Sequence, residues 1–301
     1  MSKRSITDTL RLASARPMPQ LGFGVYKSPP DLCIQSVLTA LRYGYRHIDT
    51  AQYYANEAEV GQAVQMTELV KREDVFLTTK ILTPEDTPEK NYEKCLESVR
   101  KLSPTGEFSE EDGKEKDGGY VDLFLIHSPN CGGAEGRKML WQALERLHRE
   151  GKAKSIGVSN FGIQHIEELK AFAEVWPPHV NQIELHPWSQ QTEIVEYCEK
   201  HDIVIEAYCP LVRNTKADDP TLGKVAEKHG VTPNQVLVRY CLERGWTPLP
   251  KSDNAERIAT NATVYDFELD KDDMKMLNGL NQGAAGGDCA GGVELVKANS
   301  K

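Results

Sequence analysis

The chain of 301 residues contains no run of about 18 apolar residues, so we expect no membrane-spanning helix. Its first residues, 1–8, lack the apolar core of a signal peptide. The seven cysteines are odd in number, widely scattered and without any C-x-x-C pair, which argues against a disulfide scaffold or a zinc module. Together these absences predict a reduced, cytoplasmic protein.

An excess of positive charge is also missing. The formal net charge is −9 at pH 7, which argues against a nucleic-acid surface as the main function. No G-x-G-x-x-G motif is present, so the sequence does not indicate a Rossmann-type pyrophosphate-binding loop. Neither absence excludes a local basic pocket for an anionic ligand.

The sequence does contain a repeated alternation of short apolar segments and longer segments with helical spacing. Predicted strands span 21–26, 45–48, 74–80, 121–127, 154–160, 180–184, 203–208 and 246–250. Predicted helices span 31–43, 57–68, 88–101, 135–149, 163–173, 191–201, 220–229, 233–244, 254–261 and 270–280. Apolar strands that alternate with helices are typical of a parallel sheet covered on both faces. About eight such units favour a (β/α)8 TIM barrel, a single α/β domain covering 1–301.

Three segments stand outside this repeat. Residues 10–20 predict a small hairpin or an extended lead-in. Residues 103–119 are charged and rich in glycine, which predicts a mobile surface insertion on the barrel face away from the site. The tail, 281–301, is rich in Gly, Ala and Asn and predicts no regular structure, although it is long enough to fold over the open end of the barrel.

Polar side chains lie at or near the ends of three predicted neighbouring strands. Asp49 ends the second strand and Tyr54 follows five residues later, whereas Lys80 and His127 end the next two strands. Each residue alone has a more ordinary explanation: a cap, a packing residue, a solvated lysine or a satisfied core histidine. Four such accidents on one face are less probable than one shared pocket, because the C-terminal ends of barrel strands carry the chemistry.

These four residues suit proton transfer to a carbonyl group. A free tyrosine has a pKa of about 10 and exchanges protons poorly at neutral pH. A neighbouring ammonium, here Lys80, lowers the pKa of such a phenol. Asp49 would hold Lys80 in place, and His127 would orient the substrate oxygen. Tyr54 would then give a proton to a carbonyl oxygen as hydride reaches the carbon, and would remove the alcohol proton in reverse.

The motifs around these residues resemble those of the aldo-keto reductase superfamily over nearly the whole chain. The resemblance rests on seven segments, which are Leu21-Gly-Phe-Gly, Gly44-Tyr-Arg-His-Ile-Asp-Thr-Ala with the following Tyr54 and Asn56-Glu57, Thr79-Lys80, Val121-Asp-Leu-Phe-Leu-Ile-His127, Ile156-Gly-Val-Ser-Asn-Phe161, Asn181-Gln-Ile-Glu-Leu-His-Pro187 and Leu249-Pro-Lys-Ser. The resemblance implies a (β/α)8 barrel and metal-free carbonyl reduction with NADPH or NADH. It also implies that Tyr54 is the acid/base, that Asp49 and Lys80 tune it, and that His127 orients the carbonyl.

The same resemblance implies a set of cofactor-binding residues. Ser159, Asn160 and Gln182 would bind the carboxamide, and Tyr208 would stack on the nicotinamide ring. Lys251, Ser252 and Arg257, beside a helix start, would hold the adenosine 2′-phosphate, which favours NADPH over NADH. The remaining predicted cofactor contacts are Gly24, Val25, Tyr26, Asp49, Cys209, Leu211, Arg213 and Asn261.

Predicted substrate contacts are Tyr26, Tyr53, Tyr54, His127 and Ser128, with Trp188 on another loop around the mouth. Few bulky apolar groups are available for a steroid-sized substrate, so we expect a small, polar aldehyde or ketone. Two alternatives remain open. One is a non-catalytic, NADPH-binding regulatory subunit. The other is a metal-dependent hydrolase that uses Glu184 and His186 with Asp49 and His127, which the metal-free family motif disfavours. We expect a monomer or weak dimer.

Overall fold

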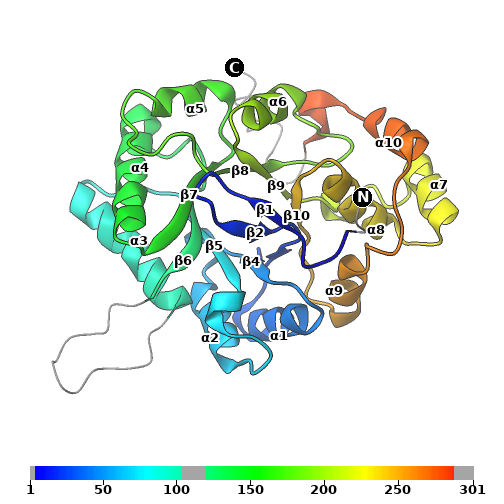
Figure 1. Cartoon of the computed structure of the whole chain (residues 1–301), viewed down its shortest axis with the longest axis horizontal. Coiled ribbons are helices and arrows are strands. Elements are labelled where there is room, and N and C mark those ends of the chain that lie inside the picture. The colour runs from blue at the N-terminus through cyan, green and yellow to red at the C-terminus, as the bar shows by residue number, and fades with distance from the viewer. Residues whose placement is uncertain (1–3, 104–118, 288–301) are drawn as a thin grey trace.

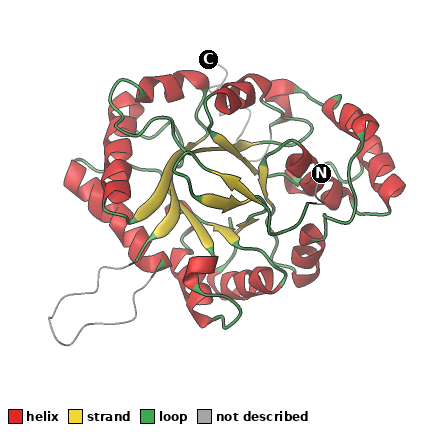
Figure 2. Cartoon of the chain, viewed as in Figure 1, coloured by secondary structure: helices red, strands yellow, loops and turns green. Residues whose placement is uncertain are grey.

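Eight parallel strands form the centre of the molecule. The computed structural model describes residues 4–103 and 119–287, and the sheet runs β10-β9-β8-β7-β6-β5-β4-β3, so that strands adjacent in sequence are neighbours in space. Figures 1 and 2 show the strands arranged around a central axis. Their bounds are β3 Phe23–Gly24, β4 His47–Asp49, β5 Phe76–Ile81, β6 Val121–Ile126, β7 Ala153–Ser159, β8 Val180–Glu184, β9 Val204–Tyr208 and β10 Thr247–Leu249.

The first and last strands close the sheet into a barrel. The Gly22 amide donates to the Pro248 carbonyl at 3.0 Å and the Gly24 amide donates to the Pro250 carbonyl at 3.1 Å. Gly22 permits this approach because a Cβ there would lie 2.4 Å from Cδ2 of Leu249. The predicted (β/α)8 barrel is confirmed.

Ten α-helices cover the outside of the barrel in the described part of the chain (Figure 2). Several begin with a capping side chain followed by proline, as at Thr87-Pro88, Asp219-Pro220 and Thr232-Pro233, an order that satisfies free backbone amides and presets the first helical turn. The helices are α1 Pro30–Arg42, α2 Glu57–Met66, α3 Pro88–Leu102, α4 Gly133–Arg149, α5 Ile163–Leu169, α6 Thr192–Lys200, α7 Pro220–His229, α8 Pro233–Glu243, α9 Ala255–Ala262 and α10 Lys271–Asn278.

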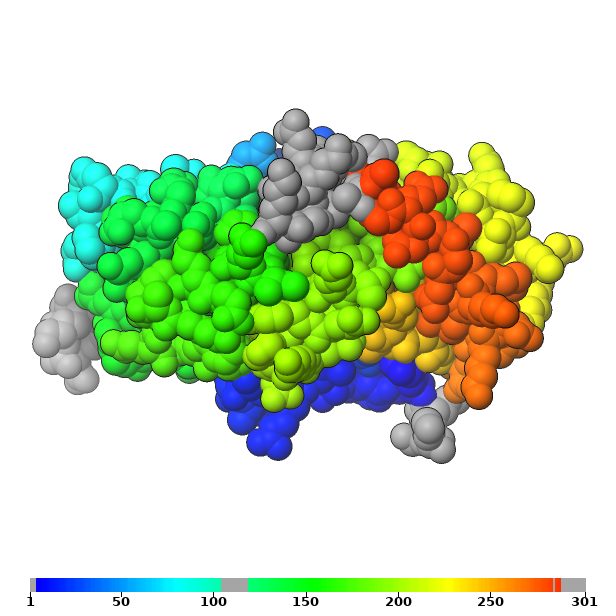
Figure 3. All heavy atoms as spheres, turned by 90° about the horizontal axis from the view of Figure 1, so that it is seen from above, coloured from blue at the N-terminus to red at the C-terminus, as the bar shows by residue number. Residues whose placement is uncertain are grey.

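A hairpin covers the N-terminal end of the barrel. Strands β1 Thr9–Arg11 and β2 Pro17–Pro19 pair antiparallel, which decides between the two predicted forms of this segment. Leu12 and Met18 are buried against Phe76 and Val180 at the starts of β5 and β8. Figure 1 shows the hairpin across the barrel centre, and Figure 3 shows this blue segment standing out from one end. The other end is left for the site.

The structure differs from the predictions in several places. The first strand is shorter than 21–26, and α5 stops at Leu169 because the next residues form i→i+3 hydrogen bonds, as from Ala171 to Glu168. The prediction that the tail lacks regular structure is wrong at Gly283–Gly286, a 3-10 turn, η4. Just before it, the Gln282 amide donates to the Trp188 carbonyl at 2.8 Å. The predictions for 104–118 and 288–301 lie outside the described residues.

Candidate active site

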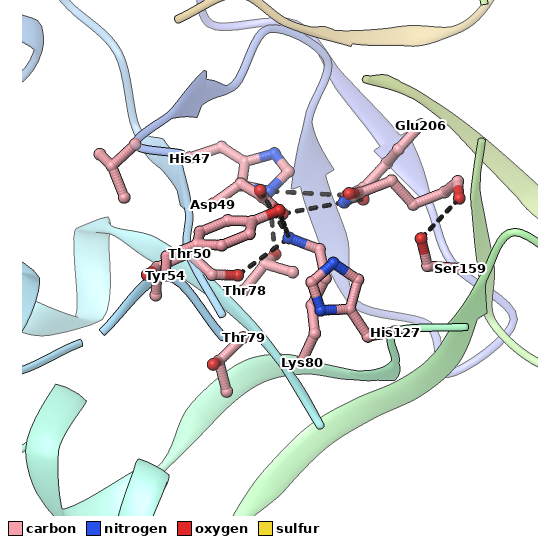
Figure 4. A network of polar contacts seen from close by, with 12 residues as sticks. His47, Asp49, Thr50, Tyr54, Thr78, Thr79, Lys80, His127, Ser159 and Glu206 are labelled. Carbon is pink, nitrogen blue, oxygen red and sulfur yellow. Dashed lines mark hydrogen bonds and ion pairs between the residues drawn. The ribbon is translucent and has the colours of Figure 1, made fainter. Parts of the chain in front are cut away.

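The four predicted catalytic residues meet at the C-terminal end of the strands. Asp49 ends β4 and Lys80 lies one residue before the end of β5, whereas His127 directly follows β6. Tyr54 ends a short 3-10 turn, η1 Gln52–Tyr54, on the loop after β4. Figure 4 shows the four side chains converging from these separate elements. Parallel strands in register bring their ends together, which is why residues far apart in sequence share one site.

A buried ammonium group lies at the centre of this cluster. Lys80 Nζ donates to Asp49 Oδ1 at 2.7 Å, to the Thr50 carbonyl at 2.9 Å and to Tyr54 Oη at 3.4 Å. The Lys80 side chain has no exposed surface. Its three donor sites therefore each have a partner, one of which is the phenol oxygen.

Two buried polar residues hold the loop that carries Tyr54. Asn56 accepts from Thr50 Oγ1 at 2.7 Å and donates to the Val25 carbonyl at 2.9 Å. The next residue, Glu57, accepts from Thr79 Oγ1 at 2.5 Å. Between the tyrosine and these anchors Ala55 takes a left-handed conformation with φ of 55°, so the chain reverses sharply and directs Tyr54 toward Lys80.

Burial is the main influence on the pKa of Tyr54, and it shifts this pKa in the direction opposite to the prediction. Burial raises the pKa of Tyr54 well above its ordinary value of 10, and the charge of Asp49 raises it further. The expected lowering by Lys80 does not prevail, because the ammonium already has a carboxylate 2.7 Å away. The phenol therefore keeps its proton at neutral pH.

His127 lies edge-on to two tyrosines at the cavity wall. Its ring centroid is 5.6 Å from that of Tyr54 and 6.3 Å from that of Tyr53. Burial, helped by the charge of Lys80, lowers the pKa of His127 to about 3. The imidazole is thus neutral at physiological pH and offers one N–H as a hydrogen-bond donor.

Beneath the four residues lies a polar layer in which the sequence analysis selected Asp49 and Gln182 but missed His47, Thr78 and Glu206. Gln182 Nε2 donates to Asp49 Oδ2 at 2.8 Å and to Glu206 Oε2 at 2.6 Å. His47 Nε2 lies 3.0 Å from Thr78 Oγ1 and 3.5 Å from Glu206 Oε1. The available signal was Glu206 itself, a charged residue inside an otherwise apolar predicted strand. Figure 4 shows His47, Thr78 and Glu206 in this layer.

A cavity of about 980 Å³ opens above this end of the barrel. It is lined by Asp49, Tyr54 and His127 and by most of the predicted ligand-binding residues, namely Gly24, Tyr26, Tyr53, Ser159, Asn160, Gln182, Tyr208, Cys209, Leu211, Arg213, Lys251, Ser252, Arg257 and Asn261. It is also lined by residues that the sequence analysis did not select, namely Lys27, Pro210, Asn214, Asn234 and Leu249.

Three predicted contact residues lie behind the cavity wall. Val25 is fully buried, and its carbonyl accepts from Asn56. Ser128 is buried too, and its hydroxyl accepts from the Asn130 amide at 3.2 Å, which stabilises its own loop. Trp188 is 1% exposed. Their side chains do not line the cavity.

At one side of the cavity the polar groups are already ordered. Tyr208 Oη donates to Asn160 Oδ1 at 2.8 Å, and Asn160 Nδ2 donates to the His127 carbonyl at 3.1 Å. Ser159 Oγ donates to the Gln182 carbonyl at 2.9 Å. These bonds tie the ends of β7, β8 and β9 together beside His127.

The opposite side of the cavity carries two cations. Arg257 Nε donates to Ser252 Oγ at 3.3 Å. Lys251 forms an ion pair with Asp253, whose other carboxylate oxygen accepts from Ser28 at 2.5 Å. Lys251, Ser252 and Arg257 all line the cavity, so this side presents positive charge and a hydroxyl next to the start of α9.

The alternatives depend on metal ligands and on membrane-spanning helices. Among residues 4–103 and 119–287, no group of three or more His, Cys, Asp and Glu side chains is placed to hold a metal ion. Within the same ranges no helix is long and apolar enough to cross a membrane. Glu184 and His186 bond to each other at 3.1 Å as a buried pair.

This chain is a (β/α)8 barrel with a buried lysine, a tyrosine and a histidine near the C-terminal ends of its strands. Its close relatives are oxidoreductases. The family model for the aldo/keto reductase family matches residues 20–282. The chain belongs to this family.

Named relatives agree with this assignment. The chain is 38% identical over 279 residues to glyoxal reductase of Bacillus subtilis, covering 92% of this chain and 94% of that protein. A solved aldo/keto reductase from Brucella melitensis superposes with a TM-score of 0.82 at 38% identity, covering 93% and 100% of the two chains. An aldo-keto reductase of Bombyx mori, solved in complex with NADP, gives 0.80 at 31% identity over 93% and 94%.

Proposed function

We propose that this protein reduces a small aldehyde or ketone to the alcohol with NADPH, and that Tyr54 is the general acid. The observation that carries the proposal is the buried ammonium of Lys80, held 2.7 Å from Asp49 Oδ1 and 3.4 Å from Tyr54 Oη. Such an arrangement has no evident structural purpose, because burying an ion pair costs several kcal/mol per ion before any gain.

The residues around the cavity fit an NADP cofactor. Lys251 and Arg257 suit a phosphate group at one side, and Gln182 suits a carboxamide at the other. The Bombyx mori relative, with its bound NADP, supports this choice. When bound, the cofactor supplies a hydride to the substrate carbon.

The side chains of this protein supply the proton and orient the carbonyl. Tyr54, whose raised pKa keeps it protonated, donates its phenolic proton to the carbonyl oxygen. Lys80 donates a hydrogen bond to the same phenol oxygen, and this bond strengthens as negative charge develops there. Neutral His127, beside Tyr54, donates an N–H to the carbonyl oxygen and fixes its direction.

Two exposed tyrosines frame the approach to these groups. Tyr53 is 65% exposed and Tyr26 is 36% exposed, and the Tyr26 ring lies 4.9 Å from that of Tyr54. Their hydroxyl groups and the nearby Lys27 and Asn214 make the described part of the mouth polar as well as aromatic. This wall suits a small, polar aldehyde or ketone, and the likeness to glyoxal reductase of Bacillus subtilis supports the same class.

Replacing Tyr54 by Phe tests the general acid. The variant keeps the ring but loses the proton donor, so carbonyl-dependent NADPH oxidation should fall at least about 100-fold, the lower range for a positioned acid. NADPH binding, followed by fluorescence quenching, should stay within a few-fold of the wild type. Near-normal turnover in Tyr54→Phe would remove the assignment.

The matched control is Tyr53→Phe. This neighbouring tyrosine is mostly exposed and makes a ring contact with His127, but no hydrogen bond joins it to Lys80 in the described structure. Its loss should change the Michaelis constant for the aldehyde and leave the turnover number nearly intact. Equal losses of turnover in both variants would point to a general disturbance of the loop.

The remaining expectations stay predictions. We propose a single-domain, cytoplasmic protein that is a monomer or weak dimer, and size-exclusion chromatography tests the oligomeric state. A non-catalytic regulatory subunit would bind NADPH without oxidising it in the presence of carbonyl compounds. The Lys80–Tyr54 contact favours the enzyme over this alternative.

A further inference from the structure

Glu206 is a carboxyl group buried inside the barrel below the site. It lies within β9 and has no exposed surface. Its Oε2 accepts from Gln182 Nε2 at 2.6 Å, whereas its Oε1 has no hydrogen-bond partner among the described residues and lies 3.5 Å from His47 Nε2. Figure 4 shows Glu206 across the network from Tyr54 and Lys80. A group so costly to bury needs a reason that packing alone does not supply.

The amide of Gln182 is held by two carboxyl groups at once. Nε2 donates to Asp49 Oδ2 at 2.8 Å and to Glu206 Oε2 at 2.6 Å. Both partners are acceptors, so only the NH2 end of the amide can face them. A flipped amide would set its oxygen against two oxygens. The amide oxygen of Gln182 is therefore directed away from both carboxyl groups, and Gln182 lines the cavity.

This orientation decides what the cavity can recognise. An amide oxygen accepts hydrogen bonds, whereas the NH2 end donates them. The primary amide of a nicotinamide has two N–H donors, and a fixed acceptor in the cavity selects them. Asp49 alone leaves one of the two amide hydrogens of Gln182 without a partner, and Glu206 supplies that partner from the opposite side.

We propose that Glu206 is a positioning residue for the cofactor: by holding the amide of Gln182 from below, it presents the Gln182 oxygen as an acceptor for the carboxamide N–H of the nicotinamide. This inference rests on the proposed use of NADP. Glu206 itself acts through Gln182 and lies outside the cavity wall.

Glu206 holds the amide of Gln182 whether or not the carboxyl group of Glu206 is ionised. Burial, together with the charge of Asp49, raises the pKa of Glu206 above its ordinary value of 4.5. In the protonated form Oε2 still accepts from Gln182, and the proton on Oε1 faces His47 Nε2. Burial lowers the pKa of His47 to about 3, so this imidazole is neutral and tolerates that neighbour.

Two substitutions separate the acceptor from the charge. Glu206→Gln keeps an oxygen that accepts from Gln182 and removes only the ionisable group. Glu206→Met introduces a side chain of similar volume and removes the acceptor, so the amide of Gln182 loses the hydrogen bond to residue 206. An apolar residue of similar volume is often tolerated at a buried ionic site, and thermal unfolding monitored by circular dichroism confirms that each variant is folded.

The readout is a ratio of dissociation constants, measured by fluorescence quenching at fixed pH and salt. The two ligands are NADP+ and its 3-acetylpyridine analogue, which has a methyl ketone in place of the amide and therefore no N–H to donate. One hydrogen bond to a fixed acceptor contributes about 1 kcal/mol, so the wild type should prefer NADP+ by about fivefold or more. A general loss of stability would weaken both ligands alike and leave this ratio unchanged.

We expect Glu206→Gln to keep the wild-type preference and Glu206→Met to lower it toward unity. An unchanged preference in folded Glu206→Met would overturn the positioning role while leaving the proposed reductase intact. Absence of NADP+ binding by the wild type would instead overturn the proposed cofactor and this inference together. Loss of the preference in Glu206→Gln as well would show that charge, not the acceptor, orients Gln182, and would overturn the inference as stated.

Discussion

The Tyr54 phenol lies beside an ammonium that already has a counterion. Lys80 is 3.4 Å from the phenol oxygen but only 2.7 Å from Asp49. The charges of Lys80 and Asp49 largely cancel at the phenol oxygen. Burial away from water is therefore the dominant effect, and it raises the pKa of Tyr54. This environment favours a proton donor at neutral pH, which suits the direction of carbonyl reduction.

The two directions of the reaction should therefore depend differently on pH. In the proposed mechanism reduction uses the protonated phenol, so its rate should change little between pH 6 and 8. Alcohol oxidation needs the phenolate as a base, and because the pKa of Tyr54 is raised, its rate should climb throughout the range from pH 6 to 9. Initial rates at saturating cofactor and substrate give both profiles.

The pH profile of alcohol oxidation can also contradict the role of Tyr54. An oxidation rate that is flat from pH 6 to 9 would mean that another group removes the alcohol proton. The Tyr54→Phe protein is the control, since any pH-dependent oxidation that survives in it cannot come from this phenol.

Individual residues differ in how far the sequence could place them. The positions of Asp49, Lys80 and His127 were predictable because a strand end fixes where each side chain emerges, and that of Tyr54 because it follows one of these ends on a short loop. The raised pKa of Tyr54 was not, because it depends on burial and on the distance from Lys80 to Asp49. The hydrogen bond that joins Gln182 to Glu206 was also hidden, since it depends on which strands lie side by side and in what register.

At the scale of elements, the two ends of the cavity are built differently. The end near β7, β8 and β9 consists of strand termini tied together by buried hydrogen bonds, as between Ser159 and Gln182. The other end is a loop followed by α9, with the half-buried Lys251 and the exposed Arg257. Here Lys251 already pairs with Asp253, whereas no carboxylate pairs with Arg257 in the described part of the chain. Arg257 should therefore carry most of the attraction for a 2′-phosphate.

Replacing Arg257 by Ala tests this division. A hydrogen bond to a charged group contributes about 1.5–3 kcal/mol, so the dissociation constant for NADPH should rise at least about tenfold. NADH lacks the 2′-phosphate and should lose much less. Fluorescence titration of both cofactors gives the comparison, and NADH serves as the internal control. Equal losses for the two cofactors would mean that Arg257 does not contact the 2′-phosphate.

Element types were predictable from apolar spacing, but some boundaries were not. Of the predicted strand 21–26, only Phe23–Gly24 has strand geometry, although the neighbouring Gly22 and Val25 amides also bond to residues beside it, Pro248 and Asp49. The predicted helix 163–173 ends at Leu169, where hydrogen bonding tightens to i→i+3. Both differences arise from tertiary geometry, which apolar periodicity does not encode.

In the whole molecule one end of the barrel is closed by packing and the other end carries the candidate site. The hairpin of β1 and β2 covers the N-terminal end of the barrel with Leu12 and Met18, and the cavity opens at the other end. The barrel was predictable because eight alternating units leave few other topologies. The polar layer of its interior was not, since it depends on side chains from β4, β5, β8 and β9 meeting at one level.

Carbonyl-dependent oxidation of NADPH by the wild-type protein is the decisive observation. Purified wild-type protein is mixed with NADPH and a panel of small aldehydes and ketones, and the loss of NADPH absorbance is followed, with NADH in parallel. We expect NADPH to be oxidised only when a carbonyl compound is present, and faster with small polar aldehydes than with bulky steroids. Quenched cofactor fluorescence without oxidation by any carbonyl compound would contradict it and would favour a regulatory subunit that binds the cofactor.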